Sequence, residues 1–158
     1  MHVRPGTPAD LLALRHLIDS IENFTPDEKE VARELAELAV SASPGERADY
    51  ELLVAEEAGA LAGYVCFGPT PMTLATWDLY WIVSSPRLRG RGAGSRLLLA
   101  MEEAARRRGG RQVRIETSSG GEYVSTRAFY DRHGYPEVAR LRDFYKPGDD
   151  LITLYKRL

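Results

Sequence analysis

The sequence has little cysteine and no long apolar run, and each shortage excludes a class of protein. The 158 residues include a single cysteine, Cys66, which excludes a disulfide framework and a cysteine-rich zinc site and fits a reducing cytoplasm. Apolar runs such as Leu97–Met101 are far shorter than the roughly 20 residues of a membrane-spanning helix. The start, Met-His-Val-Arg-Pro-Gly, has no apolar segment before a cleavage site, so we expect no signal peptide and a cytoplasmic location.

Net charge is also small, at −2. This balance argues against a nucleic-acid binder, because affinity for the phosphate backbone requires a broad basic surface. The charge is unevenly distributed, however: residues 1–86 carry 5 Lys and Arg against 14 Asp and Glu, and residues 87–158 carry 16 against 9. Eight arginines lie between residues 87 and 111. A local basic patch for a small polyanion therefore remains open.

Composition and periodicity indicate an α/β protein. Hydrophobic residues make up 44% and charged residues 28% of the chain, which is typical of a globular domain, and we expect residues 1–158 to form a single domain. Capping signals at Thr7 and Thr25 and helical spacing predict a helical pair, with further helices over 97–105 and 123–133. Strand-like segments are predicted at 50–56, 61–67, 72–83, 112–117, 135–141 and 150–158. The order, approximately βααβββαβαββ, is typical of one mixed sheet flanked by helices.

The strongest chemical signal is the segment RLRGRGAGSR at residues 87–96. Its three closely spaced glycines let the backbone approach a ligand, and the helix that follows directs free N–H groups and its positive dipole end toward the same place. The natural occupant is an anion. A dinucleotide fingerprint would need glycine at Ser95, and a P-loop would need Gly-Lys-Ser/Thr, so both patterns fit poorly. A glycine turn with solvated arginines is the remaining alternative.

Two motifs in this order resemble those of the GNAT superfamily of N-acetyltransferases. The family signature Arg/Gln-x-x-Gly-x-Gly/Ala is matched by Arg89, Gly92 and Gly94, and the segment 128–135 is similar to the family's Phe-Tyr-x-x-x-Gly-Phe/Tyr segment. The resemblance covers about residues 50–140, while the preceding residues fit the family's variable helical pair. It implies an α/β fold with a mixed, centrally splayed β-sheet that has helices on both faces.

The resemblance also implies acetyl-CoA as co-substrate. In that family the glycine loop cradles the pyrophosphate, and the strand before it splays from the next strand and binds the pantetheine arm. Ser125 stands where many members have asparagine, and we expect it to be a weaker cofactor contact. The cofactor-binding residues implied in this way are Ile82, Val83, Ser84, Arg89, Gly90, Arg91, Gly92, Ala93, Gly94, Ser95, Ser125 and Tyr130.

Acetyl transfer to an amine needs a proton for the departing thiolate and an acceptor for the amine proton. Tyr130 matches the family tyrosine that commonly acts as general acid, although a packing tyrosine on an amphipathic helix has the same pattern. An acid in a mainly apolar strand is costly unless it is paired or used, and, counted back from the glycine loop, Asp78 resembles a catalytic carboxylate that some members carry on this strand. A purely structural Asp78 remains an alternative. Glu116 is the second candidate for the base, and Glu22 is a more remote one.

Strand alternation makes a further prediction about this region. On one face of the strand predicted at 72–83 it places Asp78, Tyr80 and Ile82, together with Ser84, which follows directly.

These residues lead to the hypothesis of an N-acetyltransferase that acts on a primary amine of a small molecule or peptide by direct attack. The acidic first half favours a cationic acceptor, with a merely solvated acidic surface as the alternative. The alternative is a non-catalytic acyl-CoA-binding sensor or regulatory module, which would need neither Tyr130 nor Asp78. We expect no metal, since the three histidines lack metal-ligand spacing, and no nucleic-acid or membrane partner. The closing strands give a weak indication of a sheet-mediated homodimer.

Overall fold

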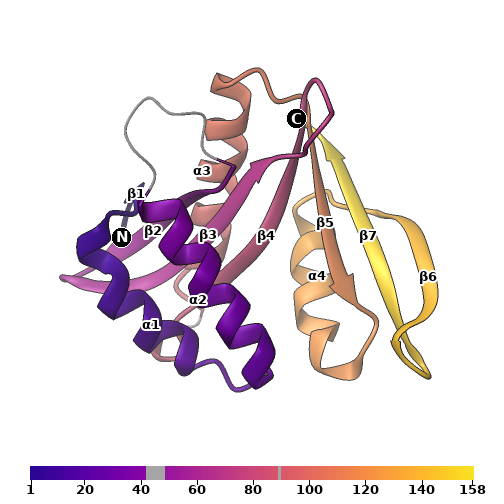
Figure 1. Ribbon diagram of the computed structural model, residues 1–158, viewed down its shortest axis with the longest axis horizontal. Helices are drawn as coiled ribbons and strands as arrows, with labels where there is room; N and C mark the ends of the chain where they lie inside the picture. Colours follow the sequence, from indigo (N-terminus) through magenta and orange to yellow (C-terminus); the bar gives the residue numbers. More distant parts are fainter. Residues whose placement is uncertain (42–48, 89) are drawn as a thin grey trace.

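The computed structural model describes residues 1–41, 49–88 and 90–158. Within these ranges, seven strands form one sheet in the order β1-β2-β3-β4-β5-β7-β6 (Figure 1). Their bounds are β1 His2–Pro5, β2 Glu51–Glu57, β3 Ala60–Pro69, β4 Thr76–Ser84, β5 Gln112–Ser118, β6 Glu137–Lys146 and β7 Asp149–Arg157. The helices are α1 Leu11–Asp19, α2 Pro26–Ser41, α3 Ala93–Arg107 and α4 Val124–Arg132, with short 3-10 turns η1 Pro8–Asp10, η2 Pro86–Leu88 and η3 Gly121–Tyr123.

The helices lie on both faces of the sheet. Helices α1 and α2 pack on one face, where Leu14 and Ala36 meet Val54 of β2. Helices α3 and α4 pack on the other face, where Leu97 and Tyr130 join a second core cluster. The predicted element order and the mixed sheet with helices on both faces are therefore confirmed.

The predicted capping signals fix the start of the helical pair. Thr25 and Glu28 form a reciprocal capping box at α2: the Thr25 N–H donates to Glu28 Oε2 (2.7 Å), and the Glu28 N–H donates to Thr25 Oγ1 (3.2 Å). At η1, Asp10 accepts from the Thr7 N–H (2.8 Å) and also from both terminal nitrogens of Arg4 (2.8 Å each). Hydrogen bonding from Arg4 lowers the pKa of Asp10 to about 2.

The sheet is split in its centre. Strands β4 and β5 pair in parallel only between Thr76–Leu79 and Gln112–Ile115. Beyond these four pairs the two strands diverge (Figure 1), and the rest of β4 pairs only with β3. One edge of β4 therefore keeps unpaired backbone groups that are available to a ligand.

A β-bulge in β4 changes which face its side chains occupy. Opposite the neighbouring residues Cys66 and Phe67 of β3 stand Trp81 and Leu79, so that Tyr80 is the extra residue. Tyr80 packs with the α1/α2 core, whereas Ile82 packs with the α3/α4 core. The prediction that Asp78, Tyr80, Ile82 and Ser84 share one face is therefore wrong, because strict alternation holds only for an unbulged strand.

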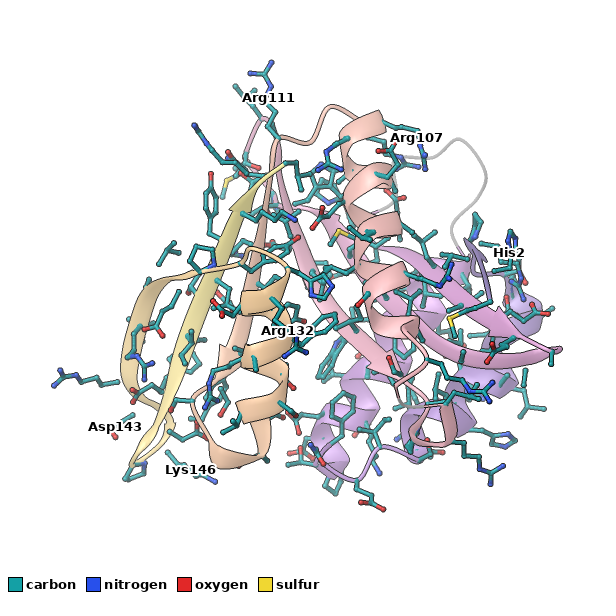
Figure 2. All side chains as sticks on the ribbon, turned by 180° about the vertical axis from the view of Figure 1, so that it is seen from behind. His2, Arg107, Arg111, Arg132, Asp143 and Lys146 are labelled. Carbon is teal, nitrogen blue, oxygen red and sulfur yellow. The ribbon has the colours of Figure 1, made fainter. Side chains whose placement is uncertain are left out.

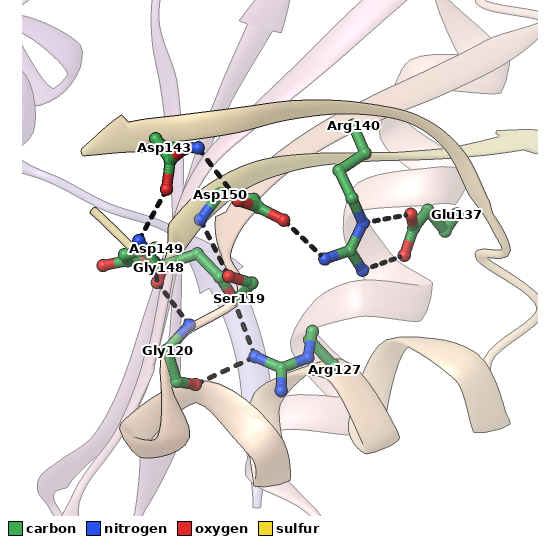
Figure 3. Close-up of polar contacts among 10 residues, drawn as sticks. Ser119, Gly120, Arg127, Glu137, Arg140, Asp143, Gly148, Asp149 and Asp150 are labelled. Atoms are coloured by element: carbon green, nitrogen blue, oxygen red, sulfur yellow. Dashed lines mark hydrogen bonds and ion pairs between the residues drawn. The ribbon is translucent and has the colours of Figure 1, made fainter. Parts of the chain in front are cut away.

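The outer hairpin of β6 and β7 is held by polar contacts (Figure 3). Every residue of β6 is exposed, so apolar burial contributes little there. Arg140 donates to both oxygens of Glu137 (2.8 Å each) and to Asp150 (2.9 Å), and Asp150 also accepts from the Asp143 N–H (2.9 Å). The hairpin thus keeps its shape without a helix on its outer strand.

Candidate active site

A cleft of about 700 Å³, which we term the main cleft, lies where β4 separates from β5. Its walls come from the α1–α2 junction, the end of β4, the glycine loop, η3 and α4. Among the sequence candidates, Ser125 and the β4 residues Ile82, Val83 and Ser84 line this cleft. The structure therefore brings the end of β4 and the start of α4 together, although Ser84 and Val124 are 40 positions apart in the sequence.

The glycine loop forms the floor of the cleft at the start of α3. Gly90 and Gly92 have φ angles of 79° and 80°, a left-handed conformation that glycine adopts without strain. A Cβ on Gly94 would lie 3.4 Å from the Phe129 ring and 3.4 Å from Ser84 Oγ, so this glycine allows close packing. Gly90, Gly92, Ala93, Gly94 and Ser95 all line the cleft.

The start of α3 gives this floor an affinity for anions. Gly92 is the N-cap residue of α3, and its carbonyl accepts from the Arg96 N–H (3.0 Å). The first N–H groups of an α-helix have no partner within the helix, and they carry the positive end of its dipole. An anion in the cleft would therefore meet several backbone donors.

The arginines near the glycine loop differ in whether they line the cleft. Arg91 donates to Glu57 (3.0 Å) at the β2–β3 turn and is not part of the cleft lining. Arg89 lies outside the described residues. Arg132 of α4 lines the cleft and lies between α3 and α4 in Figure 2. Sequence reasoning missed Arg132, which lies three residues after Phe129 and thus on the same side of α4.

Tyr130 lies in the core beside the cleft wall. Its side chain is 3% exposed and packs edge-on against Phe129 (5.3 Å between centroids) and Tyr135 (6.0 Å). Burial raises the pKa of the Tyr130 hydroxyl. This hydroxyl therefore stays protonated at neutral pH, while Phe129 rather than Tyr130 lines the cleft.

The second cavity is a pocket of about 120 Å³ at the point where β4 and β5 part, which we term the vertex pocket. It is lined by Asp78, Leu79, Tyr80, Arg114 and Glu116. The Arg114 guanidinium donates to both Asp78 oxygens (2.7 and 3.1 Å) and lies 3.5 Å from Glu116. Asp78 is buried, whereas 46% of the Glu116 side chain is exposed.

The three candidate carboxylates are therefore separated by the structure. Asp78 and Glu116 share the vertex pocket, and Glu22 lines the main cleft. Arg114 donates to both oxygens of Asp78, so Glu116 is the more accessible carboxylate of the vertex pocket. Sequence reasoning missed Arg114, since only the parallel register places it opposite Asp78.

The α1–α2 junction closes one side of the cleft. The Tyr123 hydroxyl donates to Glu28 Oε1 (3.1 Å), and the Asn23 side chain donates to the Glu122 carbonyl (3.4 Å). These contacts join α2 and the residues before it to η3 across the split sheet. No sequence motif marks this junction.

Comparison with known proteins agrees with this architecture. Residues 14–135 match the family model for the acetyltransferase (GNAT) family. A solved protein of the GNAT family from Desulfovibrio desulfuricans is 38% identical, with 99% of this chain and 98% of that chain covered and a TM-score of 0.91. The comparison with curated proteins finds no match. The fold and the cleft thus define an acyl-transfer protein, and the chain belongs to the GNAT family of acetyltransferases.

More distant solved structures share the fold. An aminoglycoside 6'-N-acetyltransferase complexed with coenzyme A is 18% identical, with 99% of this chain and 97% of that chain covered and a TM-score of 0.76. The ribosomal-protein-S18-alanine N-acetyltransferase from Escherichia coli is 21% identical, with 99% and 92% covered and a TM-score of 0.75. The GNAT family uses acetyl-CoA, and the first of these relatives is a coenzyme A complex.

The structure adds two negative observations over the residues it describes. No group of three or more His, Cys, Asp or Glu side chains in that part of the chain is arranged to hold a metal ion. Within the same residues, no helix is both long enough and apolar enough to cross a membrane.

Proposed function

We propose that this protein transfers the acetyl group of acetyl-CoA to a primary amine of a small molecule or peptide by direct attack on the thioester. The observation that carries the proposal is the presence of two unlike cavities along β4 near the split in the sheet, one lined by residues 82–84 and the other by residues 78–80. The main cleft offers backbone donors to an anion, and the vertex pocket offers charged side chains to an acceptor. A transferase needs both where the strands part.

The main cleft suits the extended, anionic shape of acetyl-CoA. The N–H groups at the start of α3 would hold the pyrophosphate, together with the Arg132 guanidinium. The unpaired edge of β4 from Ile82 to Ser84 would hydrogen-bond the pantetheine arm. Ser125 would contribute a hydroxyl from α4.

Glu116 is the residue we assign as proton acceptor. In the reaction, the neutral amine nitrogen forms a bond to the thioester carbon, the carbon–sulfur bond breaks, and the amine proton passes to Glu116 directly or through one water. Glu116 faces the vertex pocket and is half-exposed, so an acceptor amine can reach it. Asp78 is assigned a positioning role, because it holds Arg114 beside Glu116.

Tyr130 is the residue we assign as proton donor to the departing thiolate. The hydroxyl is protonated at neutral pH, as a donor must be, and its burial fits a purely packing role as well. Tyr130→Phe keeps the ring and removes only the hydroxyl. Loss of a general acid should lower kcat by about 10²- to 10⁴-fold and leave the Kd for acetyl-CoA unchanged. Unchanged kcat would assign Tyr130 to packing alone.

The surroundings of the vertex pocket favour a cationic acceptor. Burial raises the pKa of the Tyr145 hydroxyl, and the negative charges of Glu116, Asp149 and Glu28 raise it further. These carboxylates therefore produce a negative potential at Tyr145, and Glu116 among them also lines the vertex pocket, which favours an ammonium group. The distant fold relatives acetylate amines on aminoglycosides and on a ribosomal-protein alanine, which agrees with an amine acceptor.

The direct test is release of free thiol from acetyl-CoA in the presence of a panel of amines. The panel should contain polyamines, amino acids, aminoglycosides and short peptides with free N-termini. Amine-dependent thiol release above the rate without enzyme would support the transferase. Tight acetyl-CoA binding with no release by any amine, also at pH 9, would favour the alternative of a non-catalytic acyl-CoA sensor.

A further inference from the structure

His133 links the end of α4 to the floor of the main cleft. Its Nδ1 lies 2.7 Å from the Phe129 carbonyl oxygen, and its Nε2 lies 3.0 Å from Ser95 Oγ. Ser95 lines the cleft in the first turn of α3. The ring therefore spans the two helices directly behind the place assigned to the pyrophosphate.

The chemistry of these contacts fixes the proton on one ring nitrogen. A carbonyl oxygen can only accept, so Nδ1 must carry a hydrogen. The Phe129 carbonyl needs this donor, because the His133 N–H donates to Tyr130 instead (3.0 Å). In the neutral ring Nε2 has only a lone pair, and the Ser95 hydroxyl must then donate its hydrogen to the histidine.

Protonation of the ring reverses the second hydrogen bond. Nε2 then donates to Ser95 Oγ, and the Ser95 hydrogen is free to point into the cleft. A hydroxyl that presents its hydrogen binds a phosphate oxygen, whereas one that presents only lone pairs repels it. The ring also acquires a positive charge one side chain away from the anion.

We propose that His133 is a positioning residue for the cofactor pyrophosphate, which acts through Ser95 so that cofactor binding takes up a proton. The inference rests on the proposed function, since it assumes that the pyrophosphate lies at the start of α3. It adds a regulatory property to that site: affinity for the cofactor rises as the pH falls. Histidine is the residue suited to this, because its charge changes between about pH 5 and 8.

The charged groups near His133 come from three elements. Asp131 and Arg132 precede it on α4, and Arg96 follows Ser95 on α3. The Lys156 side chain of β7 passes 3.9 Å from the position of a Cβ on Gly134 and donates to Glu102 of α3 (2.7 Å). Cations outnumber carboxylates among these five groups, so the negative charge that favours the imidazolium is supplied mainly by the arriving pyrophosphate.

The test is isothermal titration calorimetry of the whole protein with 3'-dephospho-acetyl-CoA. This ligand keeps the pyrophosphate and lacks the 3'-phosphate, whose own titration near pH 6 would confuse the result. Measurement in buffers of different ionisation enthalpy gives the number of protons taken up. We expect net uptake at pH 7 and a Kd about tenfold lower at pH 5.5 than at pH 8.5, the size of one charge-assisted hydrogen bond.

Two variants separate this proposal from a purely structural role of His133. His133→Gln keeps a side-chain donor and cannot titrate, so it should show no proton uptake and a flat pH profile. Ser95→Ala keeps the histidine and removes the hydroxyl, and it should lose most of the tightening at low pH. The Ser95 variant decides the matter if His133→Gln does not fold.

The outcomes distinguish this proposal from the proposed function. A wild-type Kd that does not change with pH would overturn the role of His133, and so would a pH dependence of Kd that either variant retains. Both results would leave the transferase proposal intact. Failure of wild type to bind acetyl-CoA or its dephospho analogue at any pH would instead overturn the assignment of the cleft.

Discussion

The two cavities near the split in the sheet differ in the groups that line them: backbone groups form much of one, and side chains form most of the other. The main cleft is floored by glycines and backbone N–H groups, with Arg132 as the cation from α4. The vertex pocket is lined mainly by side chains that carry charge or a hydroxyl, among them Asp78, Arg114 and Glu116. A site made of backbone is insensitive to most substitutions and suits a constant cofactor, whereas a site made of side chains can carry the chemistry and differ between acceptors.

The largest expected effect is at the vertex pocket. Glu116→Gln keeps the shape of the side chain and cannot take the proton, so kcat at pH 7 should fall by about 10²- to 10⁴-fold. An amine with a pKa near 10 is about one part in a thousand neutral at pH 7, and part of the activity should therefore return at pH 9. Steady-state thiol release across this pH range measures the effect.

Asp78→Asn is the matched comparison within the same pocket. It removes the charge that pairs with Arg114 and leaves Glu116 in place. We expect kcat to fall by no more than about tenfold, because Glu116, the assigned proton acceptor, stays in place. If kcat falls further in Asp78→Asn than in Glu116→Gln, Asp78 is the base.

The next largest effect is expected at the main cleft. There an added negative charge, rather than removal of a side chain, should abolish acetyl-CoA binding. Acetyl-CoA at one hundred times its Kd should stabilise the wild type by about 2.7 kcal/mol. Gly92→Asp should abolish most of this, because the carboxylate would repel the pyrophosphate. Thermal unfolding with and without acetyl-CoA measures the loss.

Gly92→Asn is the control for this substitution. A Cβ at Gly92 has no atom within 4 Å, and φ there is 80°, a conformation that Asn and Asp tolerate better than other residues. The two variants therefore carry the same backbone strain and differ in charge. An equal loss of the acetyl-CoA shift in both would mean that the backbone, and not the anion, is responsible.

A smaller effect, remote from both cavities, concerns Asp10. Its pKa of about 2 in the folded protein lies below the usual value of 3.8, so its stabilising contribution is complete above about pH 4 and is lost as the pH falls toward 2. Asp10→Asn should cost about 1 to 2 kcal/mol at pH 7. Urea unfolding from pH 7 to pH 2 should show the difference from wild type shrinking only below pH 4, and a constant difference would assign the cost to packing.

The smallest effect should be a gain. The Tyr64 hydroxyl is fully buried and has no hydrogen-bond partner in the part of the chain that the structure describes. Tyr64→Phe removes an unsatisfied polar group and should raise the free energy of unfolding by about 1 kcal/mol, with kcat and the Kd for acetyl-CoA unchanged. A loss of stability in urea would indicate that the hydroxyl has a buried water partner.

The sequence predicts the cofactor side of this protein better than the acceptor side. The glycine loop is one continuous segment, and its spacing alone specifies a turn, a helix start and an anion. The vertex pocket depends on a parallel register that joins Asp78 to Arg114, 36 residues away in the chain. Neither strand contains a local signal for that register, so the partner of Asp78 could not be predicted.

The bulge at Tyr80 was also beyond prediction, for a different reason. Leu79 belongs to the core beneath α3, and Trp81 belongs to the core beneath α1 and α2. Residues two apart in a regular strand face the same side, so these two can face opposite cores only with a bulge between them. The segment from Thr76 to Ser84 looks like an ordinary apolar strand in the sequence. Only the tertiary packing decides which residue is left over.

That leftover residue has a consequence for how this enzyme can be altered by insertion or deletion. Removal of Tyr80 would restore regular alternation in β4, with Leu79 and Ile82 still facing the α3/α4 core and Trp81 still facing α1 and α2. Asp78 lines the vertex pocket and Ile82 lines the main cleft, so loss of the extra residue leaves both on their present faces of the sheet. A deletion at Tyr80 is thus less disruptive to this enzyme than its place in a central strand suggests, although it removes one side chain that lines the vertex pocket.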